Sequence, residues 1–192
     1  SFFGYHNLQR LTSVVNDHLQ PWWFFGPVLV VASFPFTPLL LFGLGRVIAA
    51  FSGGASLQRI PPRDSLADFA GSWLLAVLLL FTAAATKLPS YWLPATPAAA
   101  LLIACTARPA SLRQSKGLLI AWSCTAVLTA ILAVGLLASP VWIPLIQDPE
   151  MPTLPAELMA SGLVMRAAVC FIVALLIGVW SLRGAVKGRL LA

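Results

Sequence analysis

The sequence predicts an all-α fold, a polytopic transmembrane helix bundle of about five spans that follows an amphipathic helix on the membrane surface. Two features of the composition carry this prediction. Hydrophobic residues make up 59% of the 192 residues and charged residues only 9%, whereas a soluble domain is about 45–50% apolar and about 25% charged. A bilayer core about 30 Å thick needs roughly 20 residues per helix, so about five spans fit. A soluble enzyme, a disordered tail and a coiled coil are disfavoured.

Residues 5–20 show the periodicity of a short amphipathic helix. Its apolar stripe recurs at three- and four-residue steps and consists of Tyr5, Leu8, Leu11, Val15 and Leu19. The opposite side carries His6, Arg10, Ser13 and Asp17. We expect residues 1–20 to form an interfacial helix outside the cytoplasm that lies in the plane of the membrane surface.

Five apolar runs follow this helix, and each of them predicts a span. They cover residues 21–45, 69–86, 92–107, 117–139 and 161–182. The first run contains Pro21, Pro27, Pro35 and Pro38. Because membrane helices tolerate proline when neighbouring groups satisfy the freed carbonyls, we expect a kinked span there. The bundle thus covers residues 21–182, and residues 183–192 form a tail.

The basic residues orient the spans, because Lys and Arg concentrate in cytoplasmic loops. Alternate loops place nine of the twelve basic residues on one side, namely Arg46, Arg59, Arg63, Arg108, Arg113, Lys116, Arg183, Lys187 and Arg189. The loop at 140–160 contains no Lys or Arg. We therefore expect an extracytoplasmic N-terminus and a cytoplasmic C-terminus, with any functional site on the extracytoplasmic side.

Lys87 and the turn after it form the first candidate site. The lysine ends an apolar run and precedes Pro89, Ser90, Tyr91 and Trp92. It lies on the side where the distribution of basic residues disfavours it. One interpretation is a lysine that only snorkels to the headgroups. The other is a fixed ammonium that binds a lipid phosphate or pyrophosphate beside this rigid turn.

His6, Arg10 and Arg166 are further candidates, each with two interpretations. His6 and Arg10 either belong to a solvated helix face or border a cavity for an anionic lipid headgroup, since a guanidinium can donate two hydrogen bonds to phosphate. Arg166 lies near the start of the fifth run. It either snorkels outward or faces the bundle and pairs with a lipid phosphate or with an acidic residue. The acidic candidates are Asp148, Glu150 and Glu157.

Other kinds of site find no support in the sequence. The three cysteines, Cys105, Cys124 and Cys170, fall in apolar runs without metal-site spacing, so we predict no metal and no cofactor. No basic patch with interleaved aromatic residues indicates a nucleic-acid partner. No catalytic motif such as HExxH or a P-loop is present. A non-catalytic membrane subunit and a transporter fragment therefore stay open as alternatives.

Three segments in combination resemble a known family. They are FFGYHNLQRLTSVVNDHLQPWWFF at 2–25, SFPFTPLL at 33–40 and ATKLPSYWLPATPAAALLIA at 85–104. Together they are similar to the C-terminal half of bacterial ArnT-like, family 39 glycosyltransferases, which are related to protein O-mannosyltransferases. The resemblance covers roughly residues 1–105, and the last two spans match only as generic membrane helices.

The resemblance implies a GT-C enzyme of the bacterial inner membrane. Such an enzyme transfers a sugar from a polyprenyl-phosphate-linked donor to an extracytoplasmic lipid or protein acceptor. In these families the catalytic acidic residue lies in the first extracytoplasmic loop, so we expect a fragment whose N-terminal half is missing. The implied partners are membrane lipids, the lipid-linked sugar and that missing half. Lys87, Tyr91, His6 and Arg10 lie at the matched motifs and are the expected contacts of donor or acceptor.

Overall fold

The structure, a computed structural model, consists of helices and their connections. It describes residues 20–52, 62–107, 115–147 and 149–190. These residues contain no strand, which confirms the all-α fold class. The interfacial helix expected at 1–20, with His6 and Arg10, lies outside the described residues. The chain divides into two compact units, Ser1–Arg108 and Pro109–Ala192.

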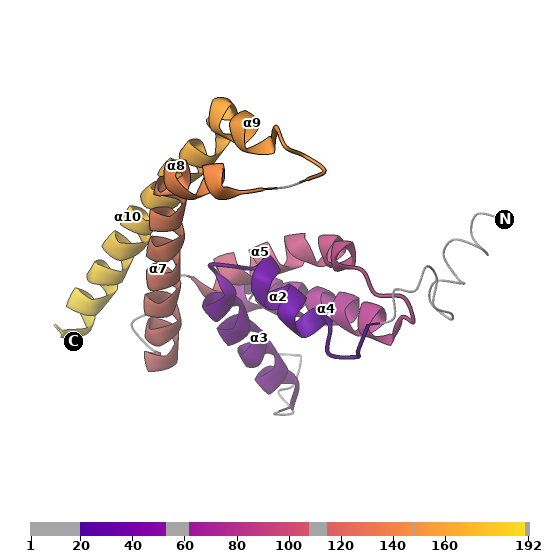
Figure 1. Cartoon of the computed structure of the whole chain (residues 1–192). Coiled ribbons are helices and arrows are strands. Elements are labelled where there is room, and N and C mark those ends of the chain that lie inside the picture. The colour runs from indigo at the N-terminus through magenta and orange to yellow at the C-terminus, as the bar shows by residue number, and fades with distance from the viewer. Residues whose placement is uncertain (1–19, 53–61, 108–114, 148, 191–192) are drawn as a thin grey trace. The chain divides into compact units, whose positions relative to one another are not determined.

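The described residues of the first unit form four α-helices and one 3₁₀ helix. They are α2 (Phe25–Ala32), α3 (Thr37–Ser52), α4 (Pro62–Ala83), η3 (Pro89–Ala95) and α5 (Thr96–Thr106). α4 packs against α5 and η3, while α3 contacts both α4 and α5 (Figure 1). α2 contacts η3, so the turn that carries Lys87 enters the helix cluster directly.

The first expected span, residues 21–45, contains a break between α2 and α3. Ser33 Oγ donates a hydrogen bond to the carbonyl of Leu29 at 2.7 Å, and Thr37 Oγ1 donates one to the carbonyl of Val30 at 2.9 Å. Pro35 and Pro38 cannot donate backbone hydrogen bonds and interrupt the helix here. The Leu29 carbonyl keeps its bond from the Ser33 N–H, whereas the Phe34 N–H donates to Val31 rather than to Val30. The Thr37 hydroxyl therefore satisfies the Val30 carbonyl, which a continuous helix would have paired. Such satisfaction is required of irregular backbone at membrane depth.

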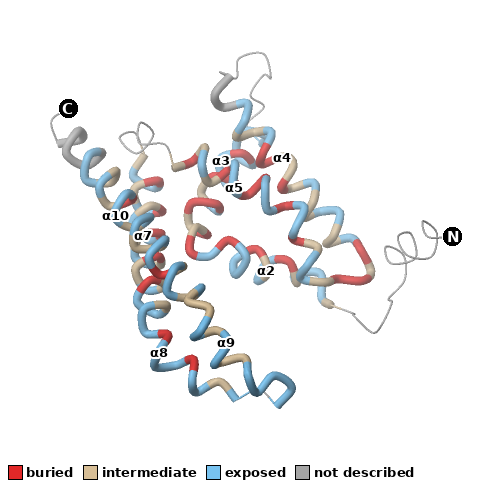
Figure 2. The backbone as a smooth tube through the Cα atoms, turned by 90° about the horizontal axis from the view of Figure 1, so that it is seen from above, coloured by how far each residue is buried: buried red, intermediate tan, exposed pale blue. Residues whose placement is uncertain are grey.

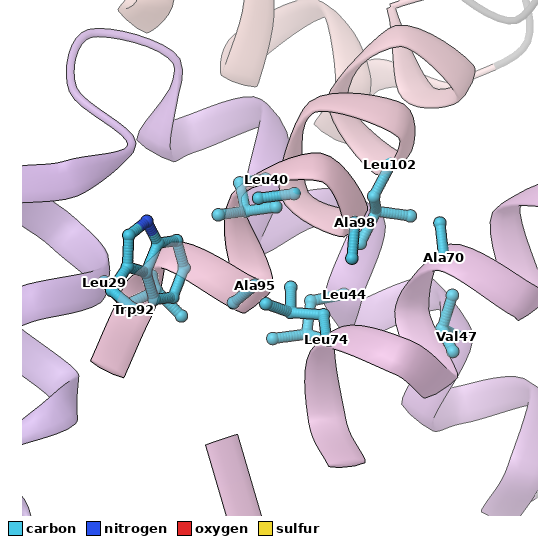
Figure 3. Packing of buried hydrophobic residues seen from close by; sticks show 11 residues of the cluster. Leu29, Leu40, Leu44, Val47, Ala70, Leu74, Trp92, Ala95, Ala98 and Leu102 are labelled. Atoms are coloured by element: carbon cyan, nitrogen blue, oxygen red, sulfur yellow. The ribbon is translucent and has the colours of Figure 1, made fainter. Parts of the chain in front are cut away.

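Small residues let the helices of the first unit approach closely. The buried cluster includes Leu40 and Leu44 of α3, Ala70 and Leu74 of α4, and Ala98 and Leu102 of α5 (Figure 3). A Cβ atom on Gly43 would collide with the Thr106 side chain. A Cβ atom on Gly71 would lie 2.7 Å from Val47 Cγ1. Close backbone approach at small residues is typical of helix packing in membranes.

The second unit is a pair of long helices joined by short ones. Its elements are α7 (Lys116–Leu137), α8 (Ser139–Trp142), η4 (Ile143–Leu145), α9 (Leu154–Ser161) and α10 (Leu163–Leu190). α7 and α10 lie side by side (Figure 1). Gly178 of α10 faces the Trp122 ring of α7, where a Cβ atom would lie 3.0 Å from Cζ3. Ser115 caps the start of α7, since its Oγ accepts from Leu118 N at 3.3 Å.

Within the part of the chain that the structure describes, three helices are long and apolar enough to cross a membrane. Their apolar segments are Ser65–Ala83, Lys116–Leu137 and Leu163–Gly184, of which only 17%, 28% and 11% is buried within the protein. Figure 2 shows this exposure along α7 and α10. Apolar faces of this extent need lipid around them, so the chain is a membrane protein. The span expected at 92–107 corresponds to η3 and the 11-residue α5.

Candidate functional site at the end of α4

Lys87 is buried just beyond the C-terminal end of α4. Its side chain is only 8% exposed. Its Nζ donates a hydrogen bond to the carbonyl of Ala84 at 2.8 Å. The ammonium therefore turns back toward the end of the helix, where the helix dipole favours a positive charge.

The ammonium of Lys87 has N–H donors that the described residues leave unused. A lysine carries three N–H donors and no acceptor, and the Ala84 carbonyl uses one of them. No described carboxylate forms an ion pair with it. Burying a charge without a counter-charge is costly, so this position favours the binding of an anion. The described residues contain no group of three His, Cys, Asp or Glu side chains that could hold a metal ion.

Tyr91 is held in the same turn by aromatic contacts. Its ring stacks on Phe81 of α4, with centroids 4.8 Å apart. Phe81 in turn contacts Phe25 of α2 at a centroid distance of 6.4 Å. The backbone N–H of Tyr91 donates to the carbonyl of Leu88 at 3.1 Å. The turn is thus fixed by side chains from α2, α4 and η3 together.

Trp92 anchors the other side of the turn in the core. It is buried and belongs to the same apolar cluster as Leu29, and the two side chains lie together in Figure 3. The neighbouring Ser90 and Leu93 are exposed. The turn therefore presents one face to the core and one face outward, with Lys87 at its start.

Phe81 and Phe25 have positioning roles that the sequence did not single out. Phe81 is the one aromatic residue between Trp73 and Tyr91. A single aromatic ring in an aliphatic run, shortly before the turn that contains Tyr91, is the sequence feature that could have indicated the contact. Its importance depends on a contact between elements, which periodicity does not reveal.

Arg166 lies in the second unit, near the start of α10. Its side chain is exposed, and its Nη2 donates to the carbonyl of Ser161 at 3.1 Å. The guanidinium therefore turns back toward the start of the helix, as a snorkelling arginine does. Among the described residues, this carbonyl is the group to which the guanidinium donates. Of the five candidates, Lys87 and Tyr91 share one turn, while His6 and Arg10 lie outside the described residues.

Known proteins of similar sequence match between about half and nearly the whole of the chain. The undecaprenyl phosphate-alpha-4-amino-4-deoxy-L-arabinose arabinosyl transferase of Pseudomonas paraeruginosa is 30% identical over 188 residues, or 98% of this chain and 29% of that protein. The chain is homologous to these arabinosyl transferases. Transferase 2 of Pseudomonas fluorescens and transferase 1 of Sodalis glossinidius, which carry the same descriptive name, are each 33% identical, over 53% and 56% of the chain and 17% of each relative.

The arabinosyl transferase relatives confirm the resemblance to ArnT-like, GT-C glycosyltransferases. Their names specify a sugar linked to undecaprenyl phosphate. The chain spans less than a third of the length of these relatives, at 17–29%. No family model matches the chain, and no solved structure matches it significantly.

Proposed function

We propose that this chain is the C-terminal membrane part of a glycosyltransferase that uses a polyprenyl-phosphate-linked sugar as donor. The acceptor is an extracytoplasmic lipid or protein. The observation that carries this proposal is the buried ammonium of Lys87, which has one hydrogen-bond partner, the Ala84 carbonyl. Phosphate is the anionic group in the donors named for the arabinosyl transferases, and an ammonium with unused N–H donors suits it.

In this proposal Lys87 binds the phosphate of the donor and Tyr91 lines the same site. Phe81 is a positioning residue, because it holds the Tyr91 ring without reaching the phosphate itself. Arg10 and His6 are proposed as further contacts of donor or acceptor, and Arg166 as a contact of a lipid headgroup. We thus assign binding of the donor or acceptor to this chain. We expect the catalytic carboxylate in the N-terminal part of the same enzyme.

We further propose that the protein lies in the bacterial inner membrane, with its N-terminus outside the cytoplasm and its C-terminus inside. The support is the distribution of basic residues, since nine of twelve fall in alternate loops on one side. This orientation puts Lys87 at the extracytoplasmic surface. A polyprenyl-phosphate sugar used there would present its phosphate at the same level.

The test is to replace Lys87 by Met in the protein encoded by the whole reading frame and to measure sugar transfer from undecaprenyl phosphate-linked aminoarabinose. A hydrogen bond to a charged group is worth about 1.5–3 kcal/mol, so we expect the KM for the donor to rise about 10- to 150-fold. The matched control is Lys116→Met, because Lys116 is exposed at the start of α7. A wild-type KM in Lys87→Met, with normal membrane insertion, would remove Lys87 from the donor site.

A further inference from the structure

The connection between α7 and α10 begins with large apolar side chains that the protein leaves uncovered. Val141 of α8 and Leu145 of η4 are each 73% exposed. Ile143, between them, is fully buried and holds the segment against the unit. No charged residue occurs from Gly117 to Gln147. This stretch is therefore unlike a loop that is surrounded by water.

These side chains come directly after a candidate membrane span. The exposed large residues of α7 include Val127, Ile131 and Val134, at steps of four and three residues, so they share one face of that helix. α7 ends at Leu137, and Val141 and Leu145 belong to the two short elements that follow it. Exposed apolar side chains thus occur both on the span and just beyond its end.

Trp142 ties α8 back onto the end of α7. Its indole Nε1 donates to the carbonyl of Gly135 at 2.8 Å. Gly135 is among the last four residues of α7, whose carbonyls lack a partner within the helix. The rest of the indole stays 41% exposed. A tryptophan with its N–H satisfied and its ring outward is typical of the headgroup level of a membrane.

Arg166 marks the other end of the connection. Its guanidinium is exposed and bonds to the Ser161 carbonyl at the end of α9, and α9 contacts both η4 and α10. An arginine that turns toward the start of a membrane helix places its charge near the headgroups. Trp142 and Arg166 are therefore two residues of types that favour the headgroup region, one near each end of this connection.

We propose that α8 and η4 lie in the membrane interface, with Val141 and Leu145 inserted among the acyl chains of the phospholipid leaflet. The occupant of this surface is lipid because the segment directly follows a candidate membrane span, exposes large apolar side chains and contains no charged residue. The first charged residue after this segment in the sequence is Asp148. This proposal does not depend on glycosyl transfer.

The test uses the photoreactive residue p-benzoyl-phenylalanine, placed in turn at Leu145 and at Val141, in the protein reconstituted into phosphatidylcholine nanodiscs. Both positions are exposed, so the larger side chain is tolerated by the fold. Val127 on the outer face of α7 is the lipid-facing control, and the exposed Thr153 before α9 is the water-facing control. Lipid adducts are measured by mass spectrometry after irradiation.

We expect lipid-adduct yields at Leu145 and Val141 that are closer to the yield at Val127 than to the yield at Thr153. Yields closer to that at Thr153 would overturn the proposal, because they would mean that water covers the segment. A main adduct on another protein segment would also overturn it, since a protein surface would then be the occupant.

Discussion

The ring of Tyr91 stacks on the ring of Phe81, with their planes inclined by 30°. Phe81 belongs to the last turn of α4 and Tyr91 to η3, so the pair closes the turn in which Lys87 lies. The contact resists a shift of η3 relative to α4. Because the ammonium of Lys87 is placed by the backbone of this turn, the aromatic pair also sets the position of the charge.

We predict that Tyr91→Ala loosens this turn and that Tyr91→Phe does not. An aromatic pair contributes about 0.5–1.5 kcal/mol beyond its buried area, and Ala loses this contribution while Phe keeps it. Thermal unfolding in detergent should therefore show a lower Tm for Tyr91→Ala and a Tm near wild type for Tyr91→Phe. If both variants lowered the Tm equally, the hydroxyl rather than the stacking would hold the turn.

We predict that Lys87→Met does not lower the stability of the ligand-free protein. The buried ammonium has no described counter-ion and one carbonyl partner, and replacing a buried charge by an apolar side chain of similar length is often neutral or stabilising. A lysine whose role is structural would instead make its loss destabilising. The measurement is the Tm of both proteins without ligand.

The same two proteins should differ when a polyprenyl phosphate is added. A ligand at about 100 times its Kd stabilises the folded state by about 2.7 kcal/mol. We therefore expect a clear rise of Tm in the wild type and in Lys116→Met, and a much smaller rise in Lys87→Met. An equal rise in all three proteins would contradict a phosphate contact at Lys87.

Hydropathy predicts where the long helices lie, but it predicts the residues at which they begin and end less well. The apolar run predicts a start at residue 69 for the second span, whereas α4 begins at Pro62. The first turns of α4 are polar, with Arg63, Asp64 and Asp68, so a hydropathy pattern does not include them. Pro62 itself suits the first position of a helix.

The candidate site was predictable as a motif, but its geometry was not. The position of Lys87 before a proline-aromatic turn can be read along the chain. Its burial depends on how η3 packs against α4 and against α2, and α2 is distant in sequence. The same holds for the break at residues 33–36, where the prolines predict a kink but only the folded chain shows that the Thr37 hydroxyl satisfies the freed Val30 carbonyl.

We predict that Gly43→Ala destabilises the first unit while Gly45→Ala does not. A Cβ atom on Gly43 would collide with the Thr106 side chain and lie 3.2 Å from Leu102 Cγ, whereas a Cβ atom on Gly45 has nothing within 4 Å. Overpacking costs typically about 1–3 kcal/mol, and Gly→Ala at an open helix position gains up to about 1 kcal/mol. A fall in Tm for both variants would show that the close approach of α3 and α5 is not the cause.

We predict that Thr37→Val destabilises the break between α2 and α3, and that Thr37→Ser preserves it. Valine has nearly the shape of threonine but leaves the Val30 carbonyl without the hydroxyl that now donates to it. A buried acceptor left unpaired costs about 1–3 kcal/mol, whereas hydrogen bonds between membrane helices average about 0.6 kcal/mol because the unfolded chain finds other partners in the membrane. Thr37 is buried, and the break in the helix leaves the Val30 carbonyl without its helical N–H donor. We therefore expect a cost of about 1–3 kcal/mol, that of an unpaired buried acceptor. Unfolding free energies of the two variants, measured in the same lipid, decide the matter, since equal values would mean that another donor reaches this carbonyl.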